Sequence, residues 1–344
     1  MSKSSFFAVE YSFSVRHYKL ERQDLKILIT GTAGRIGRSI YIRLMQNYSV
    51  IGIDRTPCST ADLVGDIRDI ELLNKGLKGV DVIVHTAALH APHVDLLPDN
   101  EFKSVNVDAT ELLMREGIRR GIKQFVFTST TALYGKASTP EGIAGWVDEN
   151  MTPQPKTIYH RSKIDAEELL QQMSKESGVP VTVIQMSRCF PESADLMAVY
   201  RLNRGIDARD VATAHLCAIE KQMTGFKRYI ISGATPFKKK CCHNLFYDAA
   251  STIQEVAPNL AREFDTRGWV LPLSIDRVYD SSAAQKELDW HPKHGYESVL
   301  RMLDDEIPEV LPVIKTANQS FNQDVRNEGV SKLRHSLIKK KNLK

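Results

Sequence analysis

Three features of secreted and membrane proteins are missing from the sequence. The five cysteines form an odd count without regular spacing, which argues against a secreted disulfide framework and for a reducing compartment. No run of about eighteen apolar residues occurs, so no segment is predicted to span a membrane. Residues 1–24 include the polar Glu10 and Tyr11 and have no small-residue cleavage site, unlike a signal peptide. We therefore predict a cytoplasmic protein that has no membrane partner.

Signatures of metal and nucleic-acid binding are also scarce. Cys241, Cys242 and His243 have no second ligand pair, and adjacent cysteines cannot easily face the same tetrahedral ion. The formal net charge is only +4, and much of the basic excess lies in residues 332–344, where no nucleic-acid motif accompanies it. We predict ordinary thiols, no metal, no nucleic-acid partner and a solvated basic tail.

Material for a folded core is present. The 344 residues are 42% hydrophobic and 26% charged, as in a soluble globular protein with one large domain or two interleaved ones. Short β-branched runs alternate with helical patterns, and the first strands are predicted at residues 25–30, 49–54, 81–88 and 123–130. Continuous apolar strands separated by helices require a parallel sheet that is covered on both faces. The predicted fold class is therefore a doubly wound α/β sheet.

A glycine-rich turn, GTAGRIG at residues 31–37, directly follows the first strand and begins a helix predicted from Ile36 to Asn47. Its glycines allow a tight turn, a close approach of the backbone to a pyrophosphate, and packing of the helix on the strand. Asp54 ends the second strand, where a carboxylate accepts hydrogen bonds from the adenosine ribose of a dinucleotide. Asp54 would repel a 2′-phosphate and so favours NAD over NADP, although Arg55 beside it could hold that phosphate.

Tyr159 and Lys163 begin a predicted helix, and their spacing of four places both side chains on one helix face. An ammonium beside a phenol favours the phenolate, so this pair predicts a tyrosine with a lowered pKa that acts as a general base. Such a pair also occurs by chance on helix surfaces. The preceding strand, however, ends in Thr128, Ser129 and Thr130, three hydroxyl residues at the same edge of the sheet.

Several further segments accompany these motifs: GDIRD at residues 65–69, HTAA at 85–88, NVDAT at 106–110 and a closing helix and turn at 280–300. Together they resemble the extended short-chain dehydrogenase/reductases, the NAD-dependent epimerase/dehydratase family, over roughly residues 25 to 305. The resemblance implies a Rossmann sheet, bound NAD and a Tyr-Lys-Thr catalytic set.

The resemblance also implies roles for individual residues. Tyr159 removes the carbinol proton, and Lys163 holds the cofactor ribose and tunes Tyr159. Thr130 orients the oxygen, with Ser129 as the neighbouring candidate. Asp66 and Ile67 flank the adenine, and other residues line the path of the cofactor. The complete cofactor set is Gly31, Ala33, Gly34, Arg35, Ile36, Gly37, Asp54, Arg55, Asp66, Ile67, Ala87, Ala88, Asn106, Tyr159 and Lys163.

The substrate side departs from the nucleotide-sugar enzymes of the family. Dehydratases carry an Asp-Glu pair after the catalytic threonine, whereas Thr131 and Ala132 stand here, so dehydration is disfavoured. The segment CFPE at residues 189–192 is similar to the uronate dehydrogenases, in which a nearby arginine holds the sugar carboxylate. The resemblance also implies that His90 and His93 lie near the mouth of the site, and the family's chemistry requires no metal there. The predicted substrate-binding residues are Thr130, Thr131, His90, Arg188 and Arg201, with Arg204 as a further anion ligand.

Four segments follow from these assignments. Residues 1–24 are an N-terminal extension, and residues 25–190 are the NAD-binding Rossmann domain. A smaller substrate-binding region, 191–315, is interleaved with the last sheet elements at about 207–233, and residues 316–344 form the basic tail.

The predicted function is an NAD-dependent oxidoreductase that transfers hydride at a hydroxyl of a sugar or sugar derivative. The alternative is an isomerase of nucleotide-sugar metabolism, an epimerase that oxidises and re-reduces a UDP-sugar with the same bound NAD. A non-catalytic NAD sensor is disfavoured because both the tyrosine and the lysine are present. The resemblance further implies a homodimer, formed through the helices at about 108–121 and 159–176.

Overall fold

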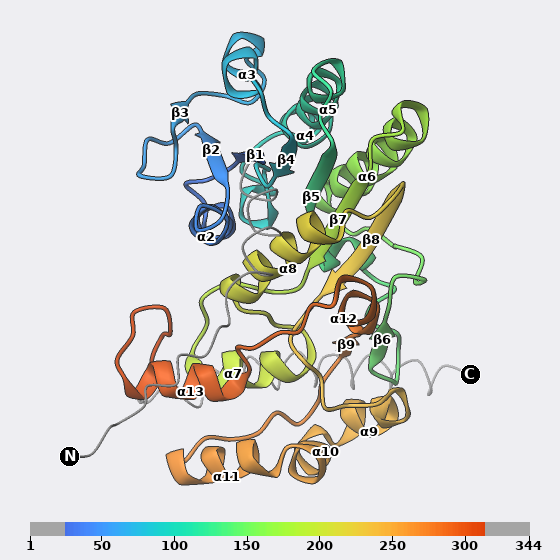
Figure 1. Ribbon diagram of the computed structural model, residues 1–344. Helices are drawn as coiled ribbons and strands as arrows, with labels where there is room; N and C mark the ends of the chain where they lie inside the picture. The colour runs from blue at the N-terminus through green and yellow to red at the C-terminus, as the bar shows by residue number, and fades with distance from the viewer. Residues whose placement is uncertain (1–24, 314–344) are drawn as a thin grey trace, which may run out of the picture.

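A parallel seven-stranded sheet forms the centre of the computed structural model, which describes residues 25–313 (Figure 1). The strands lie in the order β3-β2-β1-β4-β5-β7-β8, so the chain reverses its direction of travel beside β1. All six pairings between neighbouring strands are parallel. The strands are β1 (Lys26–Thr30), β2 (Ser49–Asp54), β3 (Leu63–Val64), β4 (Val82–His85), β5 (Gln124–Thr130), β7 (Val181–Met186) and β8 (Phe226–Ile231).

Helices cover both faces of this sheet, as the apolar strands require. On one face, Ile27 and Ile29 of β1 pack with α2 (Arg35–Leu44), α8 (Ala208–Lys221) and α12 (Ser282–Leu288). On the other face, Leu28 packs in the cluster that contains α3 (Ile70–Gly76), α5 (Ala109–Arg119) and α6 (Ile158–Ser177). Neighbouring residues of one strand therefore belong to different hydrophobic layers. The predicted doubly wound α/β sheet is confirmed.

Local signals set the ends of these helices. The Asp69 carboxylate accepts from two backbone NH groups at the start of α3, and the Thr157 hydroxyl accepts from the His160 NH at the start of α6. The helix α6 ends at Gly178, whose positive φ of 76° favours glycine. The short helical segments of this part are η1 (Ala91–His93), α4 (Asp99–Lys103), η2 (Ser104–Asp108) and η3 (Thr131–Tyr134).

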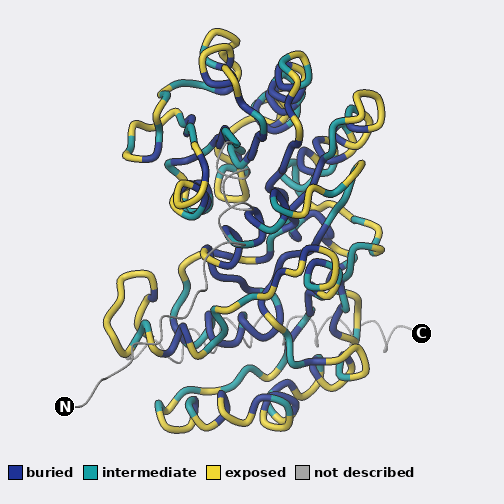
Figure 2. The backbone as a smooth tube through the Cα atoms, in the orientation of Figure 1, coloured by how far each residue is buried: buried dark blue, intermediate teal, exposed yellow. Residues whose placement is uncertain are grey.

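A second hydrophobic cluster lies below the sheet in Figure 1, and the backbone tube of Figure 2 is dark blue at buried positions of its helices. It contains α7 (Ala194–Asn203), α9 (Cys242–Tyr247), α10 (Ala249–Val256), α11 (Pro258–Arg267) and α13 (Tyr296–Asp304), with η4 (Lys239–Cys241) beside them. A two-stranded sheet, β6 (Gly145–Val147) with β9 (Arg277–Tyr279), links this part to the first. The chain returns to the main sheet through α8 and β8. Segments 1–24 and 316–344 lie outside the described residues.

No helix within residues 25–313 is long and apolar enough to cross a bilayer.

Candidate active site

A cavity of about 1170 Å³ opens at the carboxyl ends of the central strands. Its walls come from the turn after β1, the ends of β2, β4 and β5, and the first turns of α6. The segment after β7, together with residues of α7, α8, β9 and the chain following α13, closes the far end. Crevices at this edge of a doubly wound sheet are the usual ligand sites, and about 1,000 Å³ is the upper end for one small ligand. The cavity therefore has room for two ligands.

The glycine turn forms one wall of the cavity. Gly31 has a φ of +79°, and a Cβ at Gly37 would lie only 2.1 Å from the Gly31 carbonyl oxygen. These two positions therefore require glycine, and they bring the N-terminus of α2 against the cavity. Asp54 braces the turn, because its carboxylate accepts from the Ala33 NH at 2.8 Å and from the Thr56 NH at 2.8 Å.

The other predicted cofactor residues lie around this turn, with one exception. Arg55, Asp66, Ile67, Ala87 and Ala88 all line the cavity. Arg68 pairs with Asp66 at 2.8 Å and lowers the pKa of that carboxyl.

Asn106 is the exception, since it is buried behind the wall. Its side chain exchanges hydrogen bonds with both backbone groups of Leu89, at 2.8 and 2.9 Å, and reaches the Ser162 hydroxyl at 2.9 Å. Asn106 thus ties the loop after β4 to α6 without facing the cavity.

Tyr159, Lys163 and Thr130 meet in the middle of the cavity wall. The Lys163 ammonium donates to the Thr128 carbonyl at 2.8 Å and lies 3.8 Å from the centre of the Phe127 ring. The Thr130 hydroxyl is hydrogen-bonded to the Tyr159 phenol. A phenol, an ammonium and a hydroxyl are therefore available to one bound oxygen.

The pKa of Tyr159 shifts in the direction opposite to the one that its spacing from Lys163 predicts. Burial raises the pKa of Tyr159 to about 12, and the hydrogen bond from Thr130 only partly opposes this. Burial also lowers the pKa of Lys163 to about 7, against the attraction of Glu167. The sequence prediction considered only the attraction between an ammonium and a phenolate, whereas burial desolvates both groups and is the larger effect here.

Most residues predicted for the substrate also line the cavity. Thr131, His90 and Arg188 do so, and Arg188 forms an ion pair with Glu192. The His90 ring stacks on His93 with 4.6 Å between the ring centres, and burial lowers its pKa. Among the described residues, no group of three histidine, cysteine or acidic side chains could hold a metal ion.

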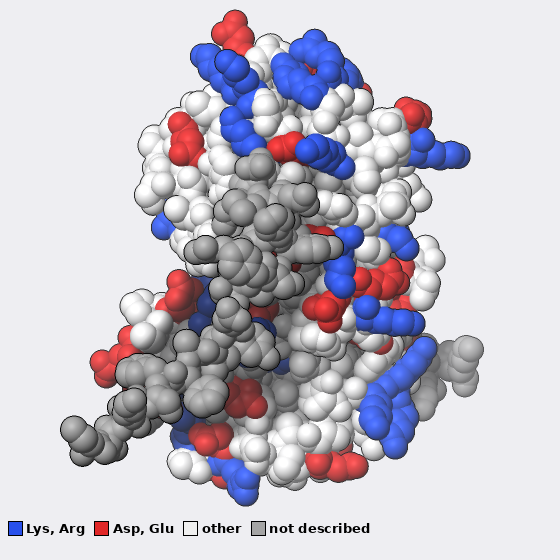
Figure 3. Space-filling view, viewed as in Figure 1, with Lys and Arg blue, Asp and Glu red and all other residues white. Residues whose placement is uncertain are grey.

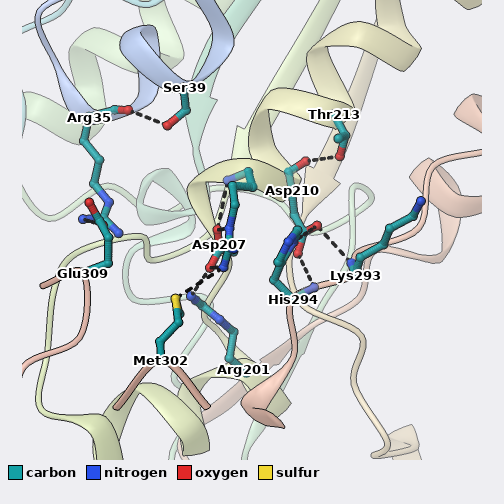
Figure 4. A network of polar contacts seen from close by, with 11 residues as sticks. Arg35, Ser39, Arg201, Asp207, Asp210, Thr213, Lys293, His294, Met302 and Glu309 are labelled. Atoms are coloured by element: carbon teal, nitrogen blue, oxygen red, sulfur yellow. Dashed lines mark hydrogen bonds and ion pairs between the residues drawn. The ribbon is translucent and has the colours of Figure 1, made fainter. Parts of the chain in front are cut away.

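Arg201 does not reach this cavity. Its side chain is 4% exposed and pairs with Asp207 at 3.2 Å (Figure 4). Asp207 also accepts from the Arg209 side chain, at 2.9 and 3.0 Å. The helix α7 directs Arg201 into the protein, so the prediction of a substrate contact is not supported by its position.

Other cationic residues occupy the far end of the cavity instead. Arg204, Arg209 and Arg277 line it, and only Arg204 was considered from the sequence. Arg277 comes from β9 and pairs with Asp276 at 2.7 Å. Nothing in the sequence pattern relates β9 to the catalytic helix, which is more than a hundred residues earlier, so sequence reasoning missed it.

Positive charge exceeds negative charge around the cavity. Its lining contains the cations Arg35, Arg38, Arg55, Lys163, Arg188, Arg204, Arg209 and Arg277, against the carboxylates Asp54, Asp66, Asp207 and Glu309. On the face shown in Figure 3, by contrast, basic and acidic side chains are mixed over the lower half, and lysines and arginines gather over α3 and α5. A cleft with excess positive charge attracts anionic ligands.

Comparison with known proteins agrees with this geometry. Residues 27–195 match the model of the NAD dependent epimerase/dehydratase family. The chain is 26% identical over 218 residues to N-acetyl-alpha-D-glucosaminyl-diphospho-ditrans,octacis-undecaprenol 4-epimerase of Escherichia coli O157:H7. This match covers 62% of this chain and 58% of that protein. It is 30% identical over 201 residues to the uncharacterized UDP-glucose epimerase YtcB of Bacillus subtilis (strain 168), over 52% of this chain and 61% of that protein. The chain thus spans about three fifths of these relatives.

The fold is shared with solved structures. A short-chain dehydrogenase/reductase superfamily protein of Agrobacterium tumefaciens, solved with bound NAD, superposes with a TM-score of 0.61. The match covers 80% of this chain and 95% of that chain at 18% sequence identity, so it speaks for the fold alone.

Proposed function

From the premise that residues 27–195 form a domain of the NAD-dependent epimerase/dehydratase family, we propose that this chain is an NAD-dependent oxidoreductase acting on a hydroxyl of a sugar or sugar derivative. One observation carries the proposal. Tyr159, Lys163 and Thr130 converge on the same cavity into which the glycine turn and the N-terminus of α2 open. A dinucleotide on the turn would present its reactive end to these three groups.

The residues of the cavity fit NAD. The cradle formed by Gly31 and Gly37 has no room for side chains, and Gly34 begins α2 without a side-chain cap, which leaves backbone NH groups for a pyrophosphate. Ala33, Arg35 and Ile36 complete this wall, Asp54 and Arg55 would hold the adenosine ribose, and Asp66 and Ile67 the adenine. The carboxylate of Asp54 favours NAD over NADP.

Each catalytic side chain has a distinct task. NAD, when bound, supplies the hydride acceptor. Tyr159 takes the proton from the substrate hydroxyl, and Thr130 donates a hydrogen bond to the oxygen as negative charge develops on it. Lys163 holds the nicotinamide ribose and, while charged, favours the phenolate of Tyr159. Because burial raises the pKa of Tyr159 to about 12, the proton transfer depends on this ammonium.

The substrate is an anionic sugar, either a uronic acid or a nucleotide sugar. The excess of cations at the cavity and the room for two ligands support this choice. A second function, epimerisation of a UDP-sugar, is favoured by the names of both relatives, which are described as epimerases. In that reaction, bound NAD would supply a reversible hydride acceptor, and Tyr159 would remove the hydroxyl proton and give it back.

Absorbance at 340 nm separates these functions. Purified protein is mixed with NAD and a panel of uronic acids, aldoses and UDP-sugars. NADH that accumulates with one sugar identifies a dehydrogenase. A UDP-sugar converted to its epimer without net NADH identifies an epimerase, and conversion of no sugar would contradict the proposal.

We also propose a homodimeric cytoplasmic enzyme. The helices α5 and α6 lie side by side on one face of the sheet and are available to pair with a second copy. The five cysteines are free thiols, which suits a reducing compartment. Sedimentation at micromolar concentration tests the dimer, and a monomer at all concentrations would contradict it.

A further inference from the structure

Glu167 is a buried carboxylate on the rear side of the catalytic helix. It lies one turn after Lys163 on α6, is 3% exposed and does not line the cavity. The Ser129 hydroxyl donates to one of its oxygens, the Gln185 amide donates to both at 3.0 Å, and Arg228 donates at 2.8 Å. A carboxylate is costly to bury, so four hydrogen bonds from three donors on three different strands indicate a site built around its charge.

Two contacts connect Glu167 to the catalytic residues. Ser129 stands in β5 between Thr128, whose carbonyl accepts from Lys163, and Thr130, which bonds Tyr159. Glu167 therefore holds the strand end that carries both contacts. The second connection is electrostatic, because residues four apart on a helix are neighbours and the interior between them is shielded from water.

We propose that Glu167 is a positioning residue that keeps the Lys163 ammonium charged and holds the end of β5 against the catalytic helix. This inference rests on the proposed role of Lys163 in the oxidoreductase. It adds a residue that touches neither substrate nor cofactor but acts through Lys163 and Ser129.

The groups around Lys163 explain why a nearby negative charge is needed to keep it protonated. Burial lowers the pKa of Lys163 to about 7, and Glu167 is the group that opposes this shift. His85 also interacts with Lys163 and has a pKa of about 3, and Tyr159, one turn earlier on α6, has a pKa of about 12. Both of these stay neutral from about pH 5 to 9, so among these groups only Lys163 changes its charge near neutrality.

Arg228 allows a second variant whose expected effect on the pKa of Lys163 is opposite, because Arg228 pairs with the same carboxylate from the opposite side. Its guanidinium comes from β8, is one third exposed, and lies outside the cavity lining. Tyr134 also faces Glu167, and burial raises its pKa, so it stays neutral. Removing Arg228 would leave the charge of Glu167 less compensated and would raise the proton affinity of Lys163.

The experiment measures the charge of Lys163 directly, without turnover. Lysines are acetylated competitively with trace acetic anhydride at a series of pH values, and the extent at Lys163 is read by mass spectrometry against the exposed Lys175 of the same helix. The proteins are the wild type, Glu167→Gln, Arg228→Gln and the double variant. Glu168→Gln, which removes an exposed charge from the next position, is the matched control.

We expect the midpoint for Lys163 to fall by about one pH unit in Glu167→Gln and to rise by about half a unit in Arg228→Gln. The double variant lies between the two, and Glu168→Gln matches the wild type. Equal midpoints in all proteins, or shifts of the same sign in both single variants, would overturn the proposal. If Glu167→Gln does not fold, the labelling midpoint of Lys163 in Arg228→Gln tests the proposal: a rise supports it, and no rise overturns it.

The labelling result does not depend on the reaction. A protein that shows the predicted shifts but converts no sugar contradicts the proposed function and leaves the role of Glu167 intact. In an active protein, the alkaline limb of the pH profile of kcat moves with the labelling midpoint, a change that a merely structural role would not produce.

Discussion

The two ends of the cleft are built in different ways. At the cofactor end, the wall is formed mainly by backbone and short motifs. Gly31 and Gly37 shape the turn, and Asp54 accepts a hydrogen bond from it across from the neighbouring strand. At the far end, the walls carry long cationic side chains from the end of α7, from α8 and from β9, and several of them pair with acids, as Arg277 does with Asp276. The first end is determined by local sequence, and the second by contacts between distant segments.

Because of this difference, the cofactor end is suited to binding a constant ligand, and the far end is suited to selecting the substrate. Backbone groups in a fixed turn suit a ligand part that is constant, such as a pyrophosphate. Paired side chains on loops and helix ends can be exchanged without disturbing the sheet, which suits a variable substrate. We therefore expect substitutions at the two ends to affect different measured quantities.

The largest effect is expected from Tyr159→Phe. Loss of the proton acceptor should lower kcat by about a thousandfold or more, within the range of general acid–base catalysis. NADH binding, measured by fluorescence titration, should change little because the glycine turn is untouched. If Tyr159→Phe keeps most of the wild-type kcat, Tyr159 is not the proton acceptor of the reaction.

Arg201→Met tests whether a buried ion pair supports the far end. The change leaves Asp207 buried with only Arg209 as its ion-pair partner, so the free energy of unfolding should fall by about 3 kcal/mol. Chemical denaturation measures this loss. The more exposed Arg204→Met is the control, and equal stability of the two variants would show that the burial of Arg201 has no energetic importance.

His215→Gln tests the pH dependence of the core beneath the cofactor end. Burial lowers the pKa of His215 to about 4, and its ring is hydrogen-bonded to the Thr128 hydroxyl at 2.8 Å. The unfolded state binds the proton near pH 6.5, so the folded protein loses stability as the pH falls from about 6.5 to 4, by about 2 kcal/mol at pH 5. Stability measured at pH 7 and pH 5 should fall less in His215→Gln. If the stability of both proteins falls equally between pH 7 and pH 5, protonation of His215 is not the cause of the loss.

The smallest effect is expected from Arg204→Ala, which removes a cation from the far end. The KM for an anionic sugar should rise about tenfold, because one charge-assisted contact is lost, while kcat and NADH affinity stay near the wild-type values. Steady-state kinetics with the substrate found in the 340 nm assay provide the measurement. A change in NADH affinity instead would mean that the two ends are not independent.

The sequence predicted the cofactor end better than the substrate end. The sheet, the glycine turn, Asp54 and the Tyr159–Lys163 pair are encoded by periodicity and fixed spacing, and the structure brings the last three to one cavity. The pairing of β6 with β9 was not predictable, since each strand has three residues and about 130 residues separate them. The direction in which Arg201 points depends on the packing of α7, and the pKa of Tyr159 depends on burial. Neither property is contained in a local pattern.

We propose that Tyr159, with NAD bound beside it, takes part in the oxidation of a sugar hydroxyl in this cavity. The most direct test is stopped-flow absorbance at 340 nm in a single turnover, with NAD-saturated protein in excess over the sugar that the panel identifies. We predict a rise in absorbance with the wild type, lasting in a dehydrogenase and transient in an epimerase, and its loss in Tyr159→Phe. An equal rise in the Phe variant, or conversion of the sugar without any reduced cofactor, would contradict the account.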